Sequence, residues 1–226
     1  MQQTAEQRTI KFSVEPDDID LLVDYSRQAG AEKAVAVRVL DLTFRESKRR
    51  KCEVPACASY LTNLHCPPKT PDAHWMQSCL PEAFEYGILA VMYSPEQDVV
   101  FPHQVRGGGE WSIKTDKLVE RIESRAQALG YYKAMGFTCG PCALCGMWTE
   151  PWIMKVLAGE DARKCAVLDG KICLLHRRSR PAAEACGINL IDFIREVGLA
   201  PKHLIFPEVS ADAVPRCPWY AFVLVG

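Results

Sequence analysis

Three cysteines within seven consecutive residues constrain this chain more than any other feature of its sequence. Cys139, Cys142 and Cys145 lie in the segment TCGPCALCG and have the spacing C-x2-C-x2-C. The glycines and the proline of this segment favour a tight loop whose backbone can turn around a bound group. A redox pair needs only two thiols, so the third thiol indicates a metal site.

The spacing of this triplet favours an iron–sulfur cluster. A cubane [4Fe-4S] cluster has four irons that each take one external thiolate, and three thiolates on one loop can reach three of them. The fourth thiolate then comes from elsewhere in the sequence. Zinc usually takes its thiolates as two separated pairs, so zinc held by the triplet and Cys173 is the alternative, and a site of thiols without metal is a further one.

Two later cysteines compete to supply the fourth thiolate. Cys173 follows a glycine turn and precedes a predicted helix with Pro181 in its first turn. Cys165 lies in the segment DARKCAV, which fits a helix with an apolar face equally well. We therefore expect the cofactor to be bound by Cys139, Cys142, Cys145 and Cys173.

A second, looser group of cysteines precedes the triplet. Cys52, Cys57 and Cys66 have the spacing C-x4-C-x8-C, and two prolines follow Cys66, as is common after a cluster ligand. We expect these three cysteines to bind a second metal, which gives one or two clusters in all. Either a distant cysteine completes this site or one iron stays open to solvent or substrate, and an open iron would support chemistry. The distant candidates are Cys79, Cys165, Cys186 and Cys217.

The number of cysteines supports metal ligation over disulfides. The chain has 226 residues and 11 cysteines, an odd number that leaves at least one unpaired. Met1 to Arg8 is polar, and no apolar run reaches the ~18 residues of a membrane-spanning helix. We therefore expect a cytoplasmic protein, where cysteines stay reduced. The net charge of −1 gives no reason to expect nucleic acid or a membrane as a partner.

The periodicity of apolar residues predicts helices and strands in alternation, in one domain that spans residues 1–226 with cysteine-rich blocks at 52–66 and 139–173. The expected class is α/β (or α+β), with a mixed β-sheet flanked by helices and cysteine-rich metal-binding loops. The predicted helices are 16–29, 72–86, 114–135 and 181–197. The predicted strands are 34–44, 87–94, 98–103, 203–207 and 219–225, with a turn at 106–111.

The cysteine motifs, taken in order, resemble a family described as predicted metal-binding proteins of unknown function, small cysteine-rich proteins found largely in anaerobic bacteria and archaea. The resemblance covers about residues 45–200 and implies metal binding, with iron–sulfur favoured, but no particular reaction. The stretch between Cys145 and Cys173 is longer than in the family pattern and contains Cys165, which leaves the fourth ligand open. The matching residues are Cys52, Cys57, Tyr60, Cys66, Pro67, Pro68, Cys139, Cys142, Cys145, Cys173, Arg180, Pro181, Glu184, Ala185, Gly187 and Ile188.

Two basic runs, 45–51 and 176–180, flank the cysteine blocks. They are either solvated surface or positive charge that stabilises an anionic cluster and docks an anionic partner. His65 adjoins Cys66 and His176 follows Cys173, so either could replace a missing thiolate.

Together these features predict an iron–sulfur protein, an oxidoreductase or an electron carrier, that acts in electron transfer or in redox chemistry at a partly open cluster. Its expected partner is a redox protein or a small-molecule substrate, and the sequence identifies no catalytic residue. A zinc-stabilised, non-enzymatic binding module is the alternative.

Overall fold

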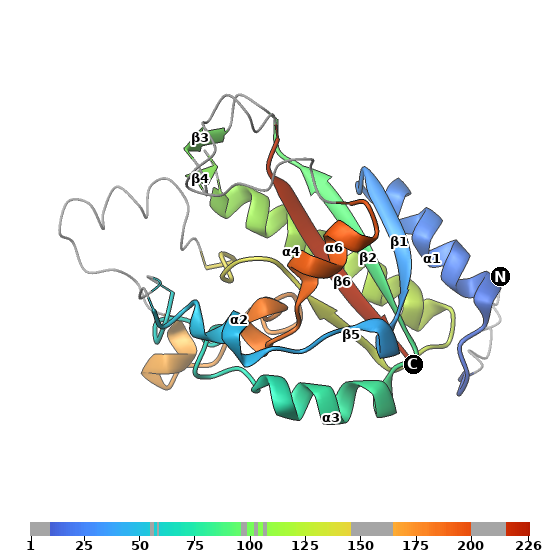
Figure 1. Ribbon diagram of the computed structural model, residues 1–226, viewed down its shortest axis with the longest axis horizontal. Coiled ribbons are helices and arrows are strands. Elements are labelled where there is room, and N and C mark those ends of the chain that lie inside the picture. Colours follow the sequence, from blue (N-terminus) through green and yellow to red (C-terminus); the bar gives the residue numbers. More distant parts are fainter. Residues whose placement is uncertain are drawn as a thin grey trace, which may run out of the picture.

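A four-stranded antiparallel sheet forms the centre of the computed structural model, with the strand order β1-β2-β6-β5 (Figure 1). β2 and β6 pair over their whole length, from Tyr86 with Val225 to Tyr93 with Pro218. The strands are β1 Lys33–Arg38, β2 Tyr86–Tyr93, β5 Ala134–Phe137 and β6 Pro218–Val225. The structure describes residues 10–54, 57, 59–95, 99–101, 104–105, 108–145, 165–199 and 216–226.

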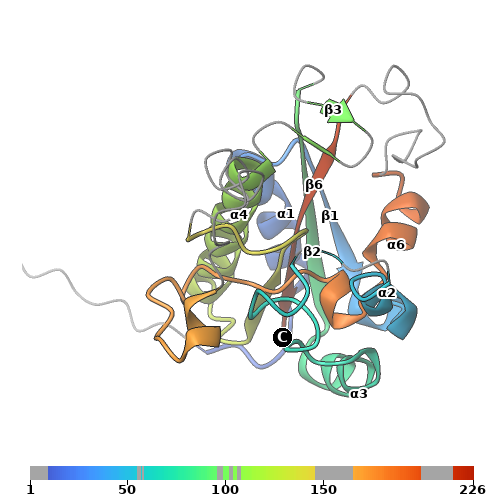
Figure 2. The same cartoon turned by 90° about the vertical axis from the view of Figure 1, so that its left-hand side faces the viewer.

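Helices cover both faces of this sheet, and this explains why β2 and β6 are apolar almost throughout (Figure 2). The helices are α1 Pro16–Gln28, α2 Glu46–Arg50, α3 Ala73–Ala83, α4 Gly108–Ala128 and α6 Leu190–Glu196. α1 and α4 pack over one face, on a core that includes Ile88 and Val223. α3 and α6 pack over the other face, on Leu89 and Phe222. Neighbouring residues of a strand point to opposite faces, so each strand contributes to both cores.

The expected combination of helices with a sheet is confirmed. The four strands pair only antiparallel, however, where we expected a mixed sheet. The predicted helices at 16–29 and 72–86 and the predicted strands at 87–94 and 219–225 are present within one to three residues. The strand expected at 98–103 is β3, Val99–Phe101, which pairs with β4, Gln104–Val105. The strand expected at 203–207 lies outside the described residues.

Three further predicted boundaries are wrong, and a glycine accounts for one of them. The helix expected at 114–135 begins at Gly108, so the turn expected at 106–111 is wrong for residues 108–111. It ends at Ala128, because Gly130 takes a positive φ of 105° that ends the helix and lets β5 begin. The strand expected at 34–44 ends at Arg38, where a 3-10 turn at Val39–Asp41 turns the chain away from the sheet.

The helix expected at 181–197 is wrong in its first half. The structure has a 3-10 turn at Glu184–Cys186, and α6 begins only at Leu190. Gly187 separates the two with a φ of 79°, a conformation that few other residues adopt. A Cβ on Gly187 would lie 2.4 Å from the Cβ of Ala73, so the close contact with α3 also requires glycine. Across the described ranges, no helix is long and apolar enough to cross a membrane.

Candidate metal centre

The loop of the cysteine triplet begins where β5 ends. Thr138 forms a parallel bridge with Ala182, in which the Thr138 amide donates to the carbonyl of Pro181 at 2.9 Å. The amide of Ala183 donates back to the carbonyl of Thr138 at 3.0 Å. The triplet therefore starts beside the segment that follows Cys173 in the sequence.

Backbone hydrogen bonds fold the first cysteine block back on itself. The amide of Cys57 donates to the carbonyl of Cys52 at 2.9 Å, and the amide of Lys69 donates to the carbonyl of Cys66 at 3.1 Å. The amide of Cys165 donates to the carbonyl of Thr62 at 2.9 Å. The block thus lies against the segment that carries Cys165, which is 103 residues further along the chain than Thr62 (165 minus 62).

The side chain of Asn63 joins the first block to the triplet loop. Asn63 is buried, and its Nδ2 donates to the carbonyl of Cys142 at 3.1 Å. Its Oδ1 accepts the backbone amide of His65 at 2.9 Å. A buried amide with both functions satisfied fixes the relative position of the two loops.

Four cysteines from two parts of the chain line one cavity. Cys142 and Cys145 come from the triplet, and Cys165 and Cys173 from the segment that follows it. The cavity has a volume of about 20 Å³, which is room for about one water molecule. The rest of its wall consists of Asn63, Leu64, His65, Leu144, Leu175 and Ser179.

Burial and mutual repulsion both oppose ionisation of these thiols. The pKa of Cys142 is raised to about 12, chiefly by burial, and the nearby charges of Asp116, Cys145 and Cys165 contribute to this rise. Burial raises the pKa of Cys145, and Cys173 and Cys165 add to this effect. A metal cation among the sulfur atoms would reverse both effects, because it binds and stabilises the thiolate form.

The first block forms a second group of thiols beside the first cavity. The pKa of Cys66 is raised to about 12, chiefly by burial, and the charges of Cys52, Cys57 and Cys142 contribute to this rise. Cys66 therefore lies within electrostatic reach of its own block and of Cys142. The two groups of thiols adjoin each other at Cys142.

Cys139 lies apart from the other two members of the triplet and does not line the cavity. Its Sγ accepts the backbone amide of Tyr220, in β6, at 3.1 Å. Burial raises the pKa of the Cys139 thiol, the amide of Tyr220 opposes this, and the charges of Glu184 and Cys217 add to it. Of the four expected cofactor ligands, the structure brings Cys142, Cys145 and Cys173 together, and with them it brings Cys165.

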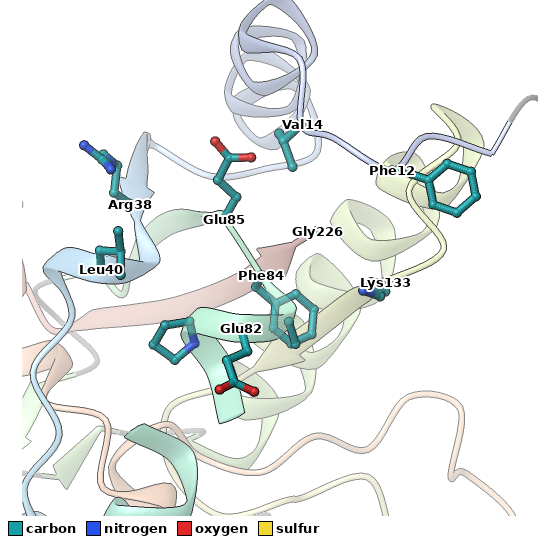
Figure 3. Close-up of a pocket in the computed structure, with 11 residues that line it drawn as sticks. Phe12, Val14, Arg38, Leu40, Glu82, Phe84, Glu85, Lys133 and Gly226 are labelled. Carbon is teal, nitrogen blue, oxygen red and sulfur yellow. The ribbon is translucent and has the colours of Figure 1, made fainter. Parts of the chain in front are cut away.

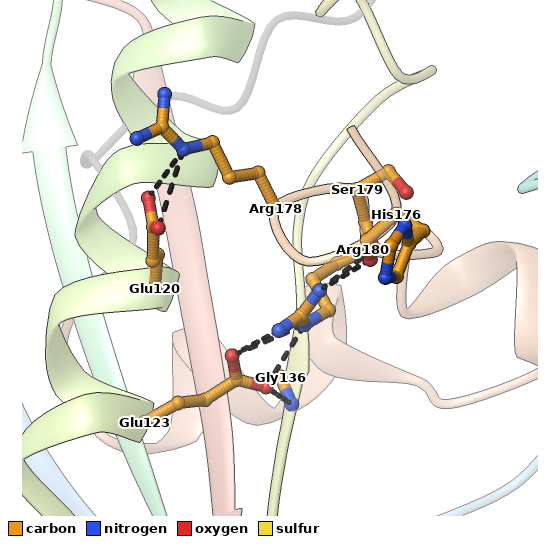
Figure 4. Close-up of polar contacts among 7 residues, drawn as sticks. All are labelled: Glu120, Glu123, Gly136, His176, Arg178, Ser179 and Arg180. Atoms are coloured by element: carbon orange, nitrogen blue, oxygen red, sulfur yellow. Dashed lines mark hydrogen bonds and ion pairs between the residues drawn. The ribbon is translucent and has the colours of Figure 1, made fainter. Parts of the chain in front are cut away.

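The second basic run fixes the segment after Cys173 against α4 and β5 (Figure 4). The Nε of Arg180 donates to both carboxylate oxygens of Glu123, at 2.9 and 3.1 Å. Glu123 is 5% exposed, and its Oε1 also accepts the amide of Gly136 at 2.6 Å. Arg178 makes a more exposed ion pair with Glu120 at 3.1 Å. These two arginines therefore stabilise the position of this segment against α4.

The first basic run contains a similar anchor in α2. The Nε of Arg49 donates to the carbonyl of Ala185 at 3.0 Å, and its Nη2 donates to the carbonyl of Thr70 at 3.1 Å. Arg49 also pairs with Glu46 within the same helix. This arginine ties the beginning of the first block to the residues that follow its end.

Asp116, on α4, also lies near Cys142, although the sequence did not mark it as a candidate site residue. It is 1% exposed, and neither carboxylate oxygen has a hydrogen-bond partner in the described structure. Burial raises its pKa to about 7, and the charge of Arg180 opposes the rise. The segment KTDK places Asp116 between lysines and gives it the appearance of a surface residue. A buried carboxylate without a partner is costly, which marks the space beside Cys142 as unusual.

The two candidate histidines differ in their positions. His65 lines the cavity, and burial and the charge of Arg180 lower its pKa, so its neutral, metal-binding form is favoured. His176 is exposed, with Nδ1 3.1 Å from the carbonyl oxygen of Cys173. Within the described ranges, no three side chains of His, Cys, Asp or Glu converge closely enough to bind a single metal ion.

Another hollow lies away from the cysteines, beside Gly226 (Figure 3). Its volume is about 240 Å³, and its charged lining residues are Arg38, Glu82, Glu85 and Lys133. No cysteine or histidine lines it, so it offers no sulfur or imidazole ligand and is not a candidate for the metal centre.

A comparison with family models identifies the group of proteins to which this architecture belongs. The model of the family Predicted metal-binding protein (DUF2284) matches residues 36–225. The chain belongs to this family. The match includes both cysteine blocks, so membership of DUF2284 supports a metal as the ligand of this region. No curated protein and no solved structure matches the chain.

Proposed function

We propose that this DUF2284 protein binds a [4Fe-4S] cluster through Cys142, Cys145, Cys165 and Cys173. The observation that carries the proposal is that these four thiols line one cavity. When bound, such a cluster supplies one-electron transfer, so the protein acts as an electron carrier or as an oxidoreductase. Compared with the expectation from spacing, Cys165 takes the place of Cys139.

The arrangement of the thiols favours a cluster over a single zinc ion. Zinc holds four thiolates at ~2.3 Å in a tetrahedron, so their sulfur atoms meet around one point. A cubane binds each thiolate on a different iron, so the sulfur atoms spread around a larger body. Cysteines that surround a cavity without converging on one point resemble the second arrangement. The space of about 20 Å³ is smaller than a cluster, so binding requires the loops to move apart.

The surroundings of the cavity also suit an anionic cluster. Leu64, Leu144 and Leu175 form an apolar part of the wall that would limit the access of water. The charge of Arg180 reaches both Asp116 and His65, as its effects on their pKa values indicate. Positive charge near a thiolate-bound cluster stabilises its reduced form. Arg180 therefore has an electrostatic role in addition to its ion pair with Glu123.

A zinc-stabilised binding module is the second candidate. It is favoured because the loops around the cavity come from distant parts of the chain and meet at hydrogen bonds such as those of Asn63 with Cys142 and of Cys165 with Thr62. A metal that only holds such loops together would be structural, and the function would then be recognition of a partner.

Anaerobic purification followed by metal and sulfide analysis distinguishes the two. The cluster proposal predicts a brown protein with about four irons and four sulfides per cluster. Cys142→Ala and Cys165→Ala should each lower the iron content by one cluster, whereas Cys79→Ala, on α3 and away from the cavity, should leave it unchanged. A colourless protein with stoichiometric zinc and no sulfide would refute the cluster. Full iron content in Cys165→Ala together with loss in Cys139→Ala would refute the ligand assignment.

A further inference from the structure

Two large apolar side chains project into solvent beside the cavity of the four cysteines. Ile172 and Leu174, the apolar pair, are 82% and 90% exposed. Cys173 and Leu175, which alternate with them along the chain, line the cavity. The segment 172–175 therefore turns every second side chain toward the cavity and the others away from it. Exposed apolar side chains that gather at a candidate site mark a surface that another molecule contacts.

Turns on both sides fix the backbone of this segment. It follows the 3-10 turn at Ala166–Asp169, where the amide of Lys171 donates to the carbonyl of Ala166 at 3.0 Å. After it, the amide of Arg178 donates to the carbonyl of Leu175 at 2.9 Å. The apolar pair is exposed because this backbone path holds it outward.

Positive charge lies on both sides of the apolar pair. Residues 165–180 contain one acidic residue, Asp169, and four basic ones. Two of the four, in the second basic run, pair with glutamates of α4. The other two, Lys171 and Arg177, are exposed, and neither forms an ion pair with another described residue. Because one precedes the pair in the sequence and one follows it, the pair has an exposed cation at each end.

The metal centre comes close to the apolar pair at Cys173, which lies between its two members in the sequence. Cys173 is half-buried and lines the cavity. A molecule seated on the pair would therefore contact the loop that carries one of the proposed cluster ligands. Such a position suits a protein that exchanges electrons with the cluster.

The charge around the apolar pair favours an acidic partner over a second copy of this chain. In a dimer with two-fold symmetry the same surface faces itself, so Lys171 and Arg177 would lie close to the same cations of the other copy and repel them. An acidic protein instead meets opposite charge at the rim and apolar contact at the centre, the usual anatomy of a protein interface. Complementary charge also speeds the encounter of the two proteins.

We infer that the surface formed by Lys171, Ile172, Leu174 and Arg177 is the docking site for an acidic redox protein that exchanges one electron with the proposed cluster. One of the two proteins loses the electron and the other gains it, and no bond forms or breaks. The inference rests on the proposed function and adds the chemistry of the partner and its place of contact. A contact surface this small gives a transient complex, in which charge governs the encounter.

The test measures electron transfer between the anaerobically reconstituted full chain and a plant-type [2Fe–2S] ferredoxin, an acidic protein. The potentials of both are measured first, and the protein with the lower potential is reduced and mixed with the other in a stopped-flow spectrometer. The rate should fall steeply as salt rises from about 0.01 M to about 1 M, because the Debye length shortens from about 30 to about 3 Å. With a basic cytochrome c as the second probe, the rate should rise with salt.

Three variants separate docking from other effects. Arg177→Glu should lower the rate with ferredoxin about tenfold at low salt and little at high salt. Leu174→Ser, which changes no charge, should lower it about fivefold at every salt concentration. Lys33→Glu makes the same change of net charge as Arg177→Glu, but it is exposed on β1, at the opposite edge of the sheet from β5, and should leave the rate unchanged. Circular dichroism, iron content and potential are checked for each variant.

The outcomes distinguish the inference from the proposed function. A cluster-loaded protein whose rates with ferredoxin are the same in the wild type, Arg177→Glu and Leu174→Ser would overturn the inference and leave the cluster in place. A wild-type dimer, or binding to phosphatidylglycerol vesicles, that is lost in Leu174→Ser while the ferredoxin rates stay unchanged would assign the surface to that occupant instead. A wild type that takes up no iron and sulfide would overturn the proposed function, and the inference with it.

Discussion

The side-chain amide of Asn63 donates to the backbone carbonyl of Cys142 at 3.1 Å, across 79 residues of sequence. This bond connects the loop of the first cysteine block to the loop of the triplet. The two loops come from opposite sides of α3, β2 and α4 in the sequence, so this buried side chain helps to fix how the two groups of thiols face each other.

Replacing Asn63 should weaken both the fold and the metal site. Asn63→Ala leaves the carbonyl of Cys142 and the amide of His65 without their partners, which should lower the free energy of unfolding by about 1–3 kcal/mol. Because the loops lose their connection, iron retention under a chelator should also fall. Anaerobic urea unfolding and timed iron release measure the two effects. Gln77→Ala, at an exposed position of α3, is the control, and equal behaviour of the two variants would contradict the role of Asn63.

The two ion pairs of the second basic run should differ in strength. Glu123 is nearly buried and bonds both Arg180 and Gly136, so Glu123→Gln should cost about 2–4 kcal/mol by leaving Arg180 without its counter-charge. The pair of Glu120 with Arg178 is more exposed, so Glu120→Gln should cost less than about 1 kcal/mol. Chemical denaturation of both variants provides the comparison. Similar losses would show that the Arg180 pair is not a structural anchor.

Asp116 should make the metal-free protein less stable as the pH rises. Its pKa is raised from 3.8 to about 7, so between these values the native state keeps a proton that the unfolded chain has lost. The contribution of Asp116 to the free energy of unfolding therefore falls from about pH 4 to about pH 7 and stays low above that. A difference of about three in pKa corresponds to about 4 kcal/mol at most.

Asp116→Asn removes this dependence. At pH 8 the metal-free variant should be more stable than the wild type, and near pH 4 the two should be alike. Unfolding in urea at several pH values gives the difference curve, with Asp20→Asn, exposed on α1, as the control. A difference that does not depend on pH would mean that the Asp116 carboxylate has a partner in solution.

Gly187 should tolerate substitution far less than Gly198, although both have a positive φ, 79° and 69°. A Cβ at Gly187 would collide with Ala73, whereas nothing lies within 4 Å of a Cβ at Gly198. Gly198→Ala should cost about 1 kcal/mol from backbone strain, and Gly187→Ala about 2–4 kcal/mol from strain and overpacking together. Thermal or chemical unfolding measures both.

Local patterns predicted much of the sheet and the helices. α1 follows from acidic residues in its first turn and a glycine after its end, and β6 from its continuous apolar run. The pattern failed where one residue interrupts it for a tertiary reason. The helix expected at 181–197 has suitable apolar spacing, but contact with Ala73 fixes Gly187 in a conformation that ends the first turn.

The candidate site was only partly predictable, because spacing describes neighbours along the chain. The spacing of the triplet indicated a metal-binding loop. It could not show that Cys139 bonds to β6, through the amide of Tyr220, while Cys142 and Cys145 line the cavity. The approach of Cys165 to Thr62 depends on folding of a long intervening sequence. The sequence gave no indication that Asp116 is buried, since an acidic residue between lysines is normally solvated. Tertiary packing, which the local sequence does not show, decided all three positions.

The position of β6 has a consequence for the order of events during synthesis. Within the described sheet β5 pairs only with β6, and β6 also holds the sulfur of Cys139 through Tyr220. A ribosome makes both cysteine blocks before it makes this strand. The nascent chain therefore presents its thiols before the support for the triplet loop exists, and we expect stable metal insertion to wait until β6 has been made and paired.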